Sequence, residues 1–250
     1  MSDLLTSAAA ARELGVAVST LKRWADEGKI PCVKTVGGHR RFRRSDLRAP
    51  TPTRESPLLE LLLSDRSASA LRGHLLSLHG EAGSWPAACK TIADTLREMG
   101  ELWVDGRLAV HDEHQATERL VRALAWCADN LTIADSAPRC LLVSPPEEVH
   151  TLGLSMVEPC LREAGWNTRW LGARTPLPQV VECIQTRQPR AVAVSASCRA
   201  KAETLQTFVQ TVRPVVAAYG GALWVGGRGP WPDGVPRLEL DQLPRAQRFR

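Results

Sequence analysis

The feature that most constrains the fold is an alternation of short apolar runs with helical segments from residue 139 onward. The apolar runs span residues 140–144, 168–171, 191–195 and 222–225. Helical patterns separate them at about 151–164, 177–187 and 203–218. Strands that alternate with helices predict a doubly wound, Rossmann-like parallel sheet over residues 136–250. Ligands of such folds bind at the carboxyl ends of the strands. A final strand at 237–240 is also expected.

The middle of the chain is helical in pattern. The helical pattern starts at residue 57, and leucines recur from Leu58. Ser84-Trp85-Pro86 is typical of a helix start, because proline is tolerated in the first turn. We expect that helix to run to Gly106 and another to follow it. Four helices with short connections predict a four-helix bundle over residues 57–135. Residues 49–56, with two prolines, are expected to form a linker.

The N-terminal residues 1–48 predict two short helices and a hairpin. Thr6 can cap a helix that ends near Gly15, and Ser19 can cap a second helix, Ser19 to Glu27, closed by Gly28. A Gly-Gly pair at 37–38 between β-prone runs is a hairpin signal, and another helix could start at residue 45. This order predicts a winged helix-turn-helix and a multidomain α and α/β protein.

Charge is concentrated at the N-terminus. The first 50 residues carry 10 Lys/Arg and 5 Asp/Glu, whereas the other 200 residues carry 22 of each. A localised positive surface is expected of a module that binds a polyanion such as DNA.

Other sequence features exclude several classes of protein. The seven cysteines are scattered and never spaced Cys-x-x-Cys, which argues against a disulfide framework and a structural zinc site. No apolar stretch is long enough to span a membrane, and the N-terminus lacks the pattern of a signal peptide. We therefore expect a cytoplasmic protein with no membrane partner.

Residues 4–48 resemble the MerR-type winged helix-turn-helix. The resemblance rests on the turn glycines Gly15 and Gly28, the helix tryptophan Trp24 and the basic wing that follows Gly37. It implies that the second helix enters a major groove and that the wing contacts phosphates. The DNA-binding residues implied are Ser19, Thr20, Lys22, Arg23, His39, Arg40 and Arg41. Trp24 and Phe42 are expected in the small core. One module covers one half-site, so the operator is expected to be bound by at least a dimer.

The segment Glu148-Val149-His150-Thr151-Leu152-Gly153 opens the first helix of the α/β region. It resembles the Asp/Glu-x-His-x-x-Gly fingerprint of cobalamin-binding domains. The resemblance implies that His150 is the lower ligand of cobalt, that Glu148 orients it, and that Gly153 leaves room for the nucleotide tail of the cofactor. It further implies that Ser195 and the pair Gly226-Gly227 approach that tail. On its own, a histidine in a loop is more often a structural hydrogen-bonding residue.

The bundle contains a second match. Trp103 is followed after nine residues by Glu113-His114, a spacing similar to that of the CarH/LitR group of light-responsive repressors that use adenosylcobalamin. The resemblance implies that these three residues cover the upper face of the cofactor and pack on its adenosyl group. The residue after Trp103 is Val104, where the best-known light sensors have a histidine that ligates cobalt after photolysis. The sequence therefore leaves open which residues ligate cobalt after illumination.

The sequence as a whole predicts a transcription regulator without enzymatic turnover, favouring a repressor that senses light through adenosylcobalamin. Its partners would be operator DNA and copies of itself in a dimer or tetramer. Three alternatives remain open: a relative that works without cobalamin or binds a bilin, a corrinoid carrier for methyl transfer, and a MerR-type activator. The last class usually has a long coiled-coil helix after the wing, where this chain has its proline-containing linker.

Overall fold

The computed structural model describes residues 4–26, 28, 30–35, 37–47 and 56–246. The chain divides into two compact units. One comprises Met1–Asp65 with Ala93–Ala116, and the other Arg66–Ile92 with Thr117–Arg250. Each is described by itself. None of the helices in the described ranges combines the length and apolar character needed to cross a membrane.

The helix-turn-helix is formed by α1 (Ser7–Leu14) and α2 (Val18–Asp26). Thr6 caps α1 as predicted, since its hydroxyl accepts a hydrogen bond from the Ala9 N–H at 3.2 Å. Gly15 closes α1 with φ of 68°. The expectation that Ser19 caps the second helix is wrong, because α2 already includes Val18 and Ser19 lies within its first turn. The expected end of that helix, residue 27, lies outside the described residues.

The wing is the predicted hairpin, extended by one strand. β2 (Val33–Lys34) pairs antiparallel with β3 (Arg40–Arg43), and β1 (Leu4–Thr6) pairs with the other edge of β3. Strand β1 was not predicted, because three residues carry too little periodicity. The helix expected from residue 45 is a single 3₁₀ turn, Arg44–Asp46. The core of this module is apolar and includes the expected Trp24 and Phe42. Its members are Ala10, Ala11, Leu21, Trp24, Ile30 and Phe42.

Four helices follow the linker region, most of which lies outside the described residues. They are α3 (Pro57–Leu63), α4 (Ala68–Ala82), α5 (Trp85–Val104) and α6 (Val110–Asp129). Helix α5 starts as predicted, with the Ser84 hydroxyl accepting from the Ala87 N–H at 3.4 Å, and it ends two residues before Gly106. Helices α5 and α6 each have residues in both compact units. The four-helix bundle as a separate domain stays a prediction.

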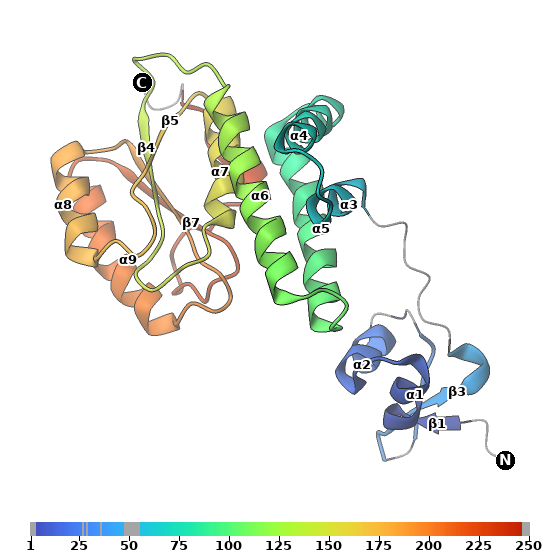
Figure 1. Ribbon diagram of the computed structural model, residues 1–250. Coiled ribbons are helices and arrows are strands. Elements are labelled where there is room, and N and C mark those ends of the chain that lie inside the picture. The colour runs from blue at the N-terminus through green and yellow to red at the C-terminus, as the bar shows by residue number, and fades with distance from the viewer. Residues whose placement is uncertain (1–3, 27, 29, 36, 48–55, 247–250) are drawn as a thin grey trace. The chain divides into compact units, whose positions relative to one another are not determined.

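The α/β domain has the predicted doubly wound sheet. Its strands are β4 (Arg139–Val143), β5 (Asn167–Trp170), β6 (Ala191–Ser195) and β7 (Ala222–Gly226), all parallel in the order β5-β4-β6-β7. Helix α7 (Leu152–Glu163) covers one face, and α8 (Leu177–Arg187) and α9 (Ala202–Ala217) cover the other (Figure 1).

Alternate residues of the strands build the two apolar layers. Leu141 and Val143 pack toward α8 and α9, whereas Cys140 and Leu142 pack toward α7. A strand that is buried on both faces needs an unbroken apolar run, which is why the runs were visible in the sequence. All seven cysteines are free thiols.

The expected strand at 237–240 is largely wrong. Arg237 forms a single parallel bridge with Val225, and the chain then turns into a 3₁₀ helix at Leu240–Gln242. Two hydrogen bonds fix the following segment: Trp166 Nε1 donates to the Pro244 carbonyl at 2.6 Å, and the Ala246 N–H donates to the Ala164 carbonyl at 2.9 Å.

Candidate functional site

The strand order places a switch point between β4 and β6. The next strand in the chain, β5, pairs with one edge of β4, and the strand after it, β6, pairs with the other edge. The loops after these two strands diverge there and leave a crevice at the carboxyl edge of the sheet. The loop after β4 carries Glu148 and His150, Ser195 is the last residue of β6, and the loop after β6 carries Ser197. The predicted motif therefore lies where a doubly wound fold binds its ligand.

Glu148 and His150 form one hydrogen-bonded unit. Glu148 Oε1 lies 2.6 Å from His150 Nδ1 and 2.8 Å from the backbone N of His150. Because a carboxylate can only accept, Nδ1 carries the proton in this bond, and in a neutral ring Nε2 is then the nitrogen with the lone pair. The His150 side chain is 50% exposed, whereas that of Glu148 is 3% exposed. A buried carboxylate thus holds an imidazole whose other nitrogen can bind a metal ion.

A third contact ties Glu148 to the neighbouring loop. The backbone N–H of Ser197 donates to Glu148 Oε2 at 2.7 Å. Burial by itself would raise the pKa of Glu148, but the hydrogen bonds from His150 and Ser197 outweigh it, and the pKa lies below its ordinary value of 4.5. The carboxylate is therefore ionised at neutral pH, which favours the protonated Nδ1. The sequence did not point to Ser197, since a backbone donor has no residue signature.

Three glycines and one serine pack closely beside this loop. A Cβ atom on Gly153 would lie 2.5 Å from Ser195 Oγ, and one on Gly227 would lie 2.4 Å from the Ala196 carbonyl oxygen and 2.9 Å from Ser195 Oγ. A Cβ atom on Gly226 would lie 3.4 Å from the Leu238 carbonyl oxygen. The predicted residues Gly153, Ser195, Gly226 and Gly227 therefore meet at one place. The absence of a Cβ atom at Gly153 and at Gly227 lets the helix and the strand ends approach each other.

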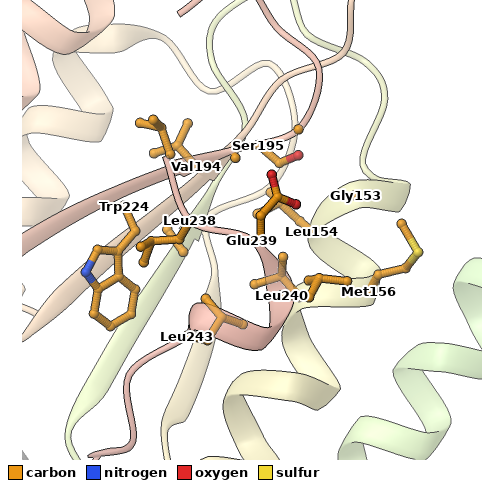
Figure 2. A pocket seen from close by; sticks show the side chains of 15 residues that line it. Gly153, Leu154, Met156, Val194, Ser195, Trp224, Leu238, Glu239, Leu240 and Leu243 are labelled. Atoms are coloured by element: carbon orange, nitrogen blue, oxygen red, sulfur yellow. The ribbon is translucent and has the colours of Figure 1, made fainter. Parts of the chain in front are cut away.

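A cavity of about 180 Å³ opens beside these residues (Figure 2). Apolar side chains from the core and from the segment after β7 form most of its wall. The lining residues that the sequence did not single out include Met156, Val157, Trp224, Leu238, Glu239, Leu240 and Leu243. Only the predicted pairing of residues 237–240 with the sheet hinted at this wall, and it did not indicate which side chains face the cavity.

The predicted cap residues lie in the other compact unit. Trp103 and Val104 are exposed at the end of α5, and Glu113 and His114 lie in the first two turns of α6. His114 Nε2 is 3.6 Å from Glu113 Oε2. Their role toward a cofactor stays a prediction.

The predicted DNA-binding residues fall into two groups. Ser19, Lys22 and His39 are exposed to solvent. Arg41 is half-buried and donates to the Arg40 carbonyl at 3.3 Å, and Arg40 in turn pairs with Asp26.

Thr20 and Arg23 are engaged within their own compact unit. The Thr20 hydroxyl donates to Asp105 Oδ1 at 2.7 Å, and Arg23 Nη2 is 3.6 Å from the same oxygen. Thr20 is fully buried in this arrangement. Ser19, Lys22 and His39 are thus the most exposed members of the set, and the contact of the set with DNA stays a prediction.

Comparison with known protein families identifies two domains. Residues 4–49 match the helix-turn-helix domain, and residues 138–234 match the B12 binding domain. The second match covers the strands and loops that form the Glu148–His150 unit and much of the cavity. The matches support the predicted fold class and the predicted resemblance of the α/β region to cobalamin-binding domains.

Two curated proteins of Myxococcus xanthus are similar to parts of the chain. The HTH-type transcriptional repressor CarA is 34% identical over 131 residues, which are 50% of this chain and 43% of the relative. The HTH-type transcriptional repressor CarH is 28% identical over 143 residues, which are 55% of this chain and 46% of the relative. The aligned part spans less than half the length of either relative. With the two domain matches, these likenesses confirm the predicted resemblance to helix-turn-helix regulators that carry a cobalamin-binding domain.

A solved structure supports the fold. The monomethylamine corrinoid protein of Methanosarcina barkeri superposes with a TM-score of 0.55 at 13% identity, covering 78% of this chain and 93% of that one. At this identity the likeness concerns the fold alone.

Proposed function

We propose that this chain, which combines a helix-turn-helix domain with a B12 binding domain, is a DNA-binding transcription regulator whose state depends on bound cobalamin. The observation that carries the proposal is the Glu148–His150 unit at the switch point of the sheet, followed directly by helix α7, whose Gly153 lines a cavity together with the ends of β6 and β7. Both curated relatives are named as repressors, so the role we favour is repression without catalytic turnover.

The residues present suit a corrinoid. His150 offers Nε2 as a nitrogen ligand for cobalt, and Glu148 fixes the tautomer and raises the basicity of the ring. The glycines around Ser195 keep the wall of the cavity free of side chains, and the apolar lining suits a planar lower base. Ser195 would contact the nucleotide tail near the mouth of the cavity.

The finer proposal concerns the signal. An adenosyl form of the cofactor supplies a cobalt–carbon bond that green or near-ultraviolet light breaks. Trp103, Glu113 and His114 would pack on the adenosyl group, so its loss would remove a packing partner from α5 and α6. We propose that this changes the oligomer, and that fewer linked DNA-binding modules release the operator because multivalent binding is lost. A cytoplasmic location belongs to the same proposal.

The test is size-exclusion chromatography of the full chain with adenosylcobalamin, in the dark and after illumination. We expect a larger species in the dark, a smaller one in light, and loss of the difference in His150→Ala. His74→Ala, which changes a histidine in α4, is the matched control. Protein that stays colourless after desalting would refute the cofactor and favour a relative that acts without cobalamin. Methyl transfer with a partner enzyme would favour the carrier alternative.

A further inference from the structure

The segment after β7 builds one wall of the cavity and is firmly anchored. The Leu238 N–H donates to the Val225 carbonyl at 2.9 Å, and Arg237 Nη2 donates to the Gly227 carbonyl at 2.6 Å. Lys90 Nζ lies 2.7 Å from Asp241 Oδ2. These contacts fix residues 237–241 against β7 at one end and against helix α5 at the other.

Glu239 occupies the centre of this wall. Its backbone N–H donates to Gln242 Oε1 at 3.1 Å, and the Gln242 N–H donates to the Glu239 backbone carbonyl at 3.0 Å. These two bonds fix the backbone of Glu239 and leave acceptor sites on its carboxylate open. Among the described residues that line the cavity, Ser195 and Glu239 alone have side chains that contain oxygen.

The cavity is thus divided by polarity. In Figure 2 the Glu239 carboxylate lies on the side of Ser195, whereas the Trp224 indole and Leu243 lie on the other side. An occupant that satisfies both halves carries hydroxyl groups next to a planar apolar ring. A carboxylate repels a phosphate but accepts a hydrogen bond from a sugar hydroxyl, as acidic residues do with ribose in other doubly wound folds.

We propose that Glu239 binds a ribose hydroxyl in the nucleotide tail of the corrinoid. This inference rests on the proposed function and deepens it, because it adds a residue that distinguishes a complete corrinoid from one without its nucleotide. The apolar ring of the lower base lies against Trp224 and Leu243, and the sugar lies at the mouth, between Ser195 and Glu239.

The test compares two probes on the full chain by absorbance titration in the dark: adenosylcobalamin, and adenosylcobinamide, which lacks the nucleotide. We expect Glu239→Ala to weaken binding of adenosylcobalamin by about five- to tenfold and to leave adenosylcobinamide binding unchanged. Glu239→Gln, which keeps an acceptor oxygen, is expected to lose less. Glu203→Ala, on α9 away from the cavity, is the control.

The outcomes separate the inference from its premise. If Glu239→Ala lowers the affinity for both probes equally, Glu239 has a merely structural role and the ribose contact is overturned. If Glu239→Ala binds adenosylcobalamin as tightly as the wild type, the contact is overturned as well. A wild-type chain that binds neither probe would refute the proposed function itself, and the contact with it.

Discussion

The Cβ position of Gly153 lies 2.5 Å from the Oγ atom of Ser195. Real Cβ atoms do not approach a neighbour so closely, so a side chain at residue 153 must displace the hydroxyl or the helix that carries it. Gly153 lies in the first turn of α7, next to the loop of His150, and Ser195 ends β6. The contact therefore sets how closely the motif helix packs on the strand beside it.

We expect Gly153→Ala to lower the free energy of unfolding by about 1–3 kcal/mol, since the added methyl group overpacks the contact. Denaturant unfolding of the cofactor-free protein measures this. The double variant Gly153→Ala/Ser195→Ala should recover most of the loss, because the nearest remaining neighbour is then Ser195 Cβ at 3.5 Å. If the double variant loses as much stability as the two single variants together, the two positions are not in direct contact.

We expect that Ser195→Ala does not restore the stability that Gly227→Ala loses. Gly227 has φ of 77°, which disfavours a side chain, and its nearest neighbour would be the backbone oxygen of Ala196 at 2.4 Å. Removing the Ser195 hydroxyl leaves that oxygen in place. Unfolding of Gly227→Ala with and without Ser195→Ala checks this, and recovery by the second change would show that the backbone contact does not matter.

Glu148 should make stability depend on pH in the acidic range. Its pKa in the folded protein lies below 4.5, so it contributes stability that is fully present at neutral pH and is lost as pH falls through the folded pKa. Glu148→Gln should therefore show a shallower fall of the unfolding free energy below pH 4.5. Unfolding curves measured across this range test the slope, and identical slopes would disprove the contribution.

Glu148 should also govern corrinoid affinity through His150. Glu148→Ala removes the partner of Nδ1, and we expect the affinity for adenosylcobalamin to fall by about 10- to 100-fold. Absorbance titration measures it. Glu147→Ala is the matched control. The Glu147 carboxylate is exposed and pairs with Lys201 rather than with His150. Equal affinity in Glu148→Ala and wild type would refute the positioning role.

We expect the wing to contribute to DNA binding through contacts with the phosphates of the DNA backbone. We expect Arg41→Gln to weaken binding of a mixed-sequence DNA duplex and to reduce the slope of log affinity against log salt by about 0.9, as for one lost phosphate contact. Fluorescence anisotropy at several salt concentrations measures the slope. Arg213→Gln, on α9, should leave it unchanged. A slope that stays the same in Arg41→Gln would place this arginine outside the DNA contact.

The sequence by itself determined the local elements and the place of the motif. Short apolar runs, the cap at Thr6 and the helix start at Ser84 depend on neighbours within a few residues, so each was visible in the chain. The carboxyl ends of parallel strands meet at one edge, so the sequence also placed His150 at a ligand crevice. Ser19 was wrongly expected as a cap, because one residue of shift at a helix end costs little. The strand expected at 237–240 was largely wrong, because only residue 237 pairs with the sheet.

Only the tertiary structure decided which distant groups meet. The pairing of β4 with β6 brings the Ser197 N–H to Glu148 and the Ser195 hydroxyl to Gly153. The segment after β7 folds back over the sheet and adds Glu239 to the cavity. These contacts join residues far apart in the chain, and they depend on the packing of whole elements rather than on any local preference.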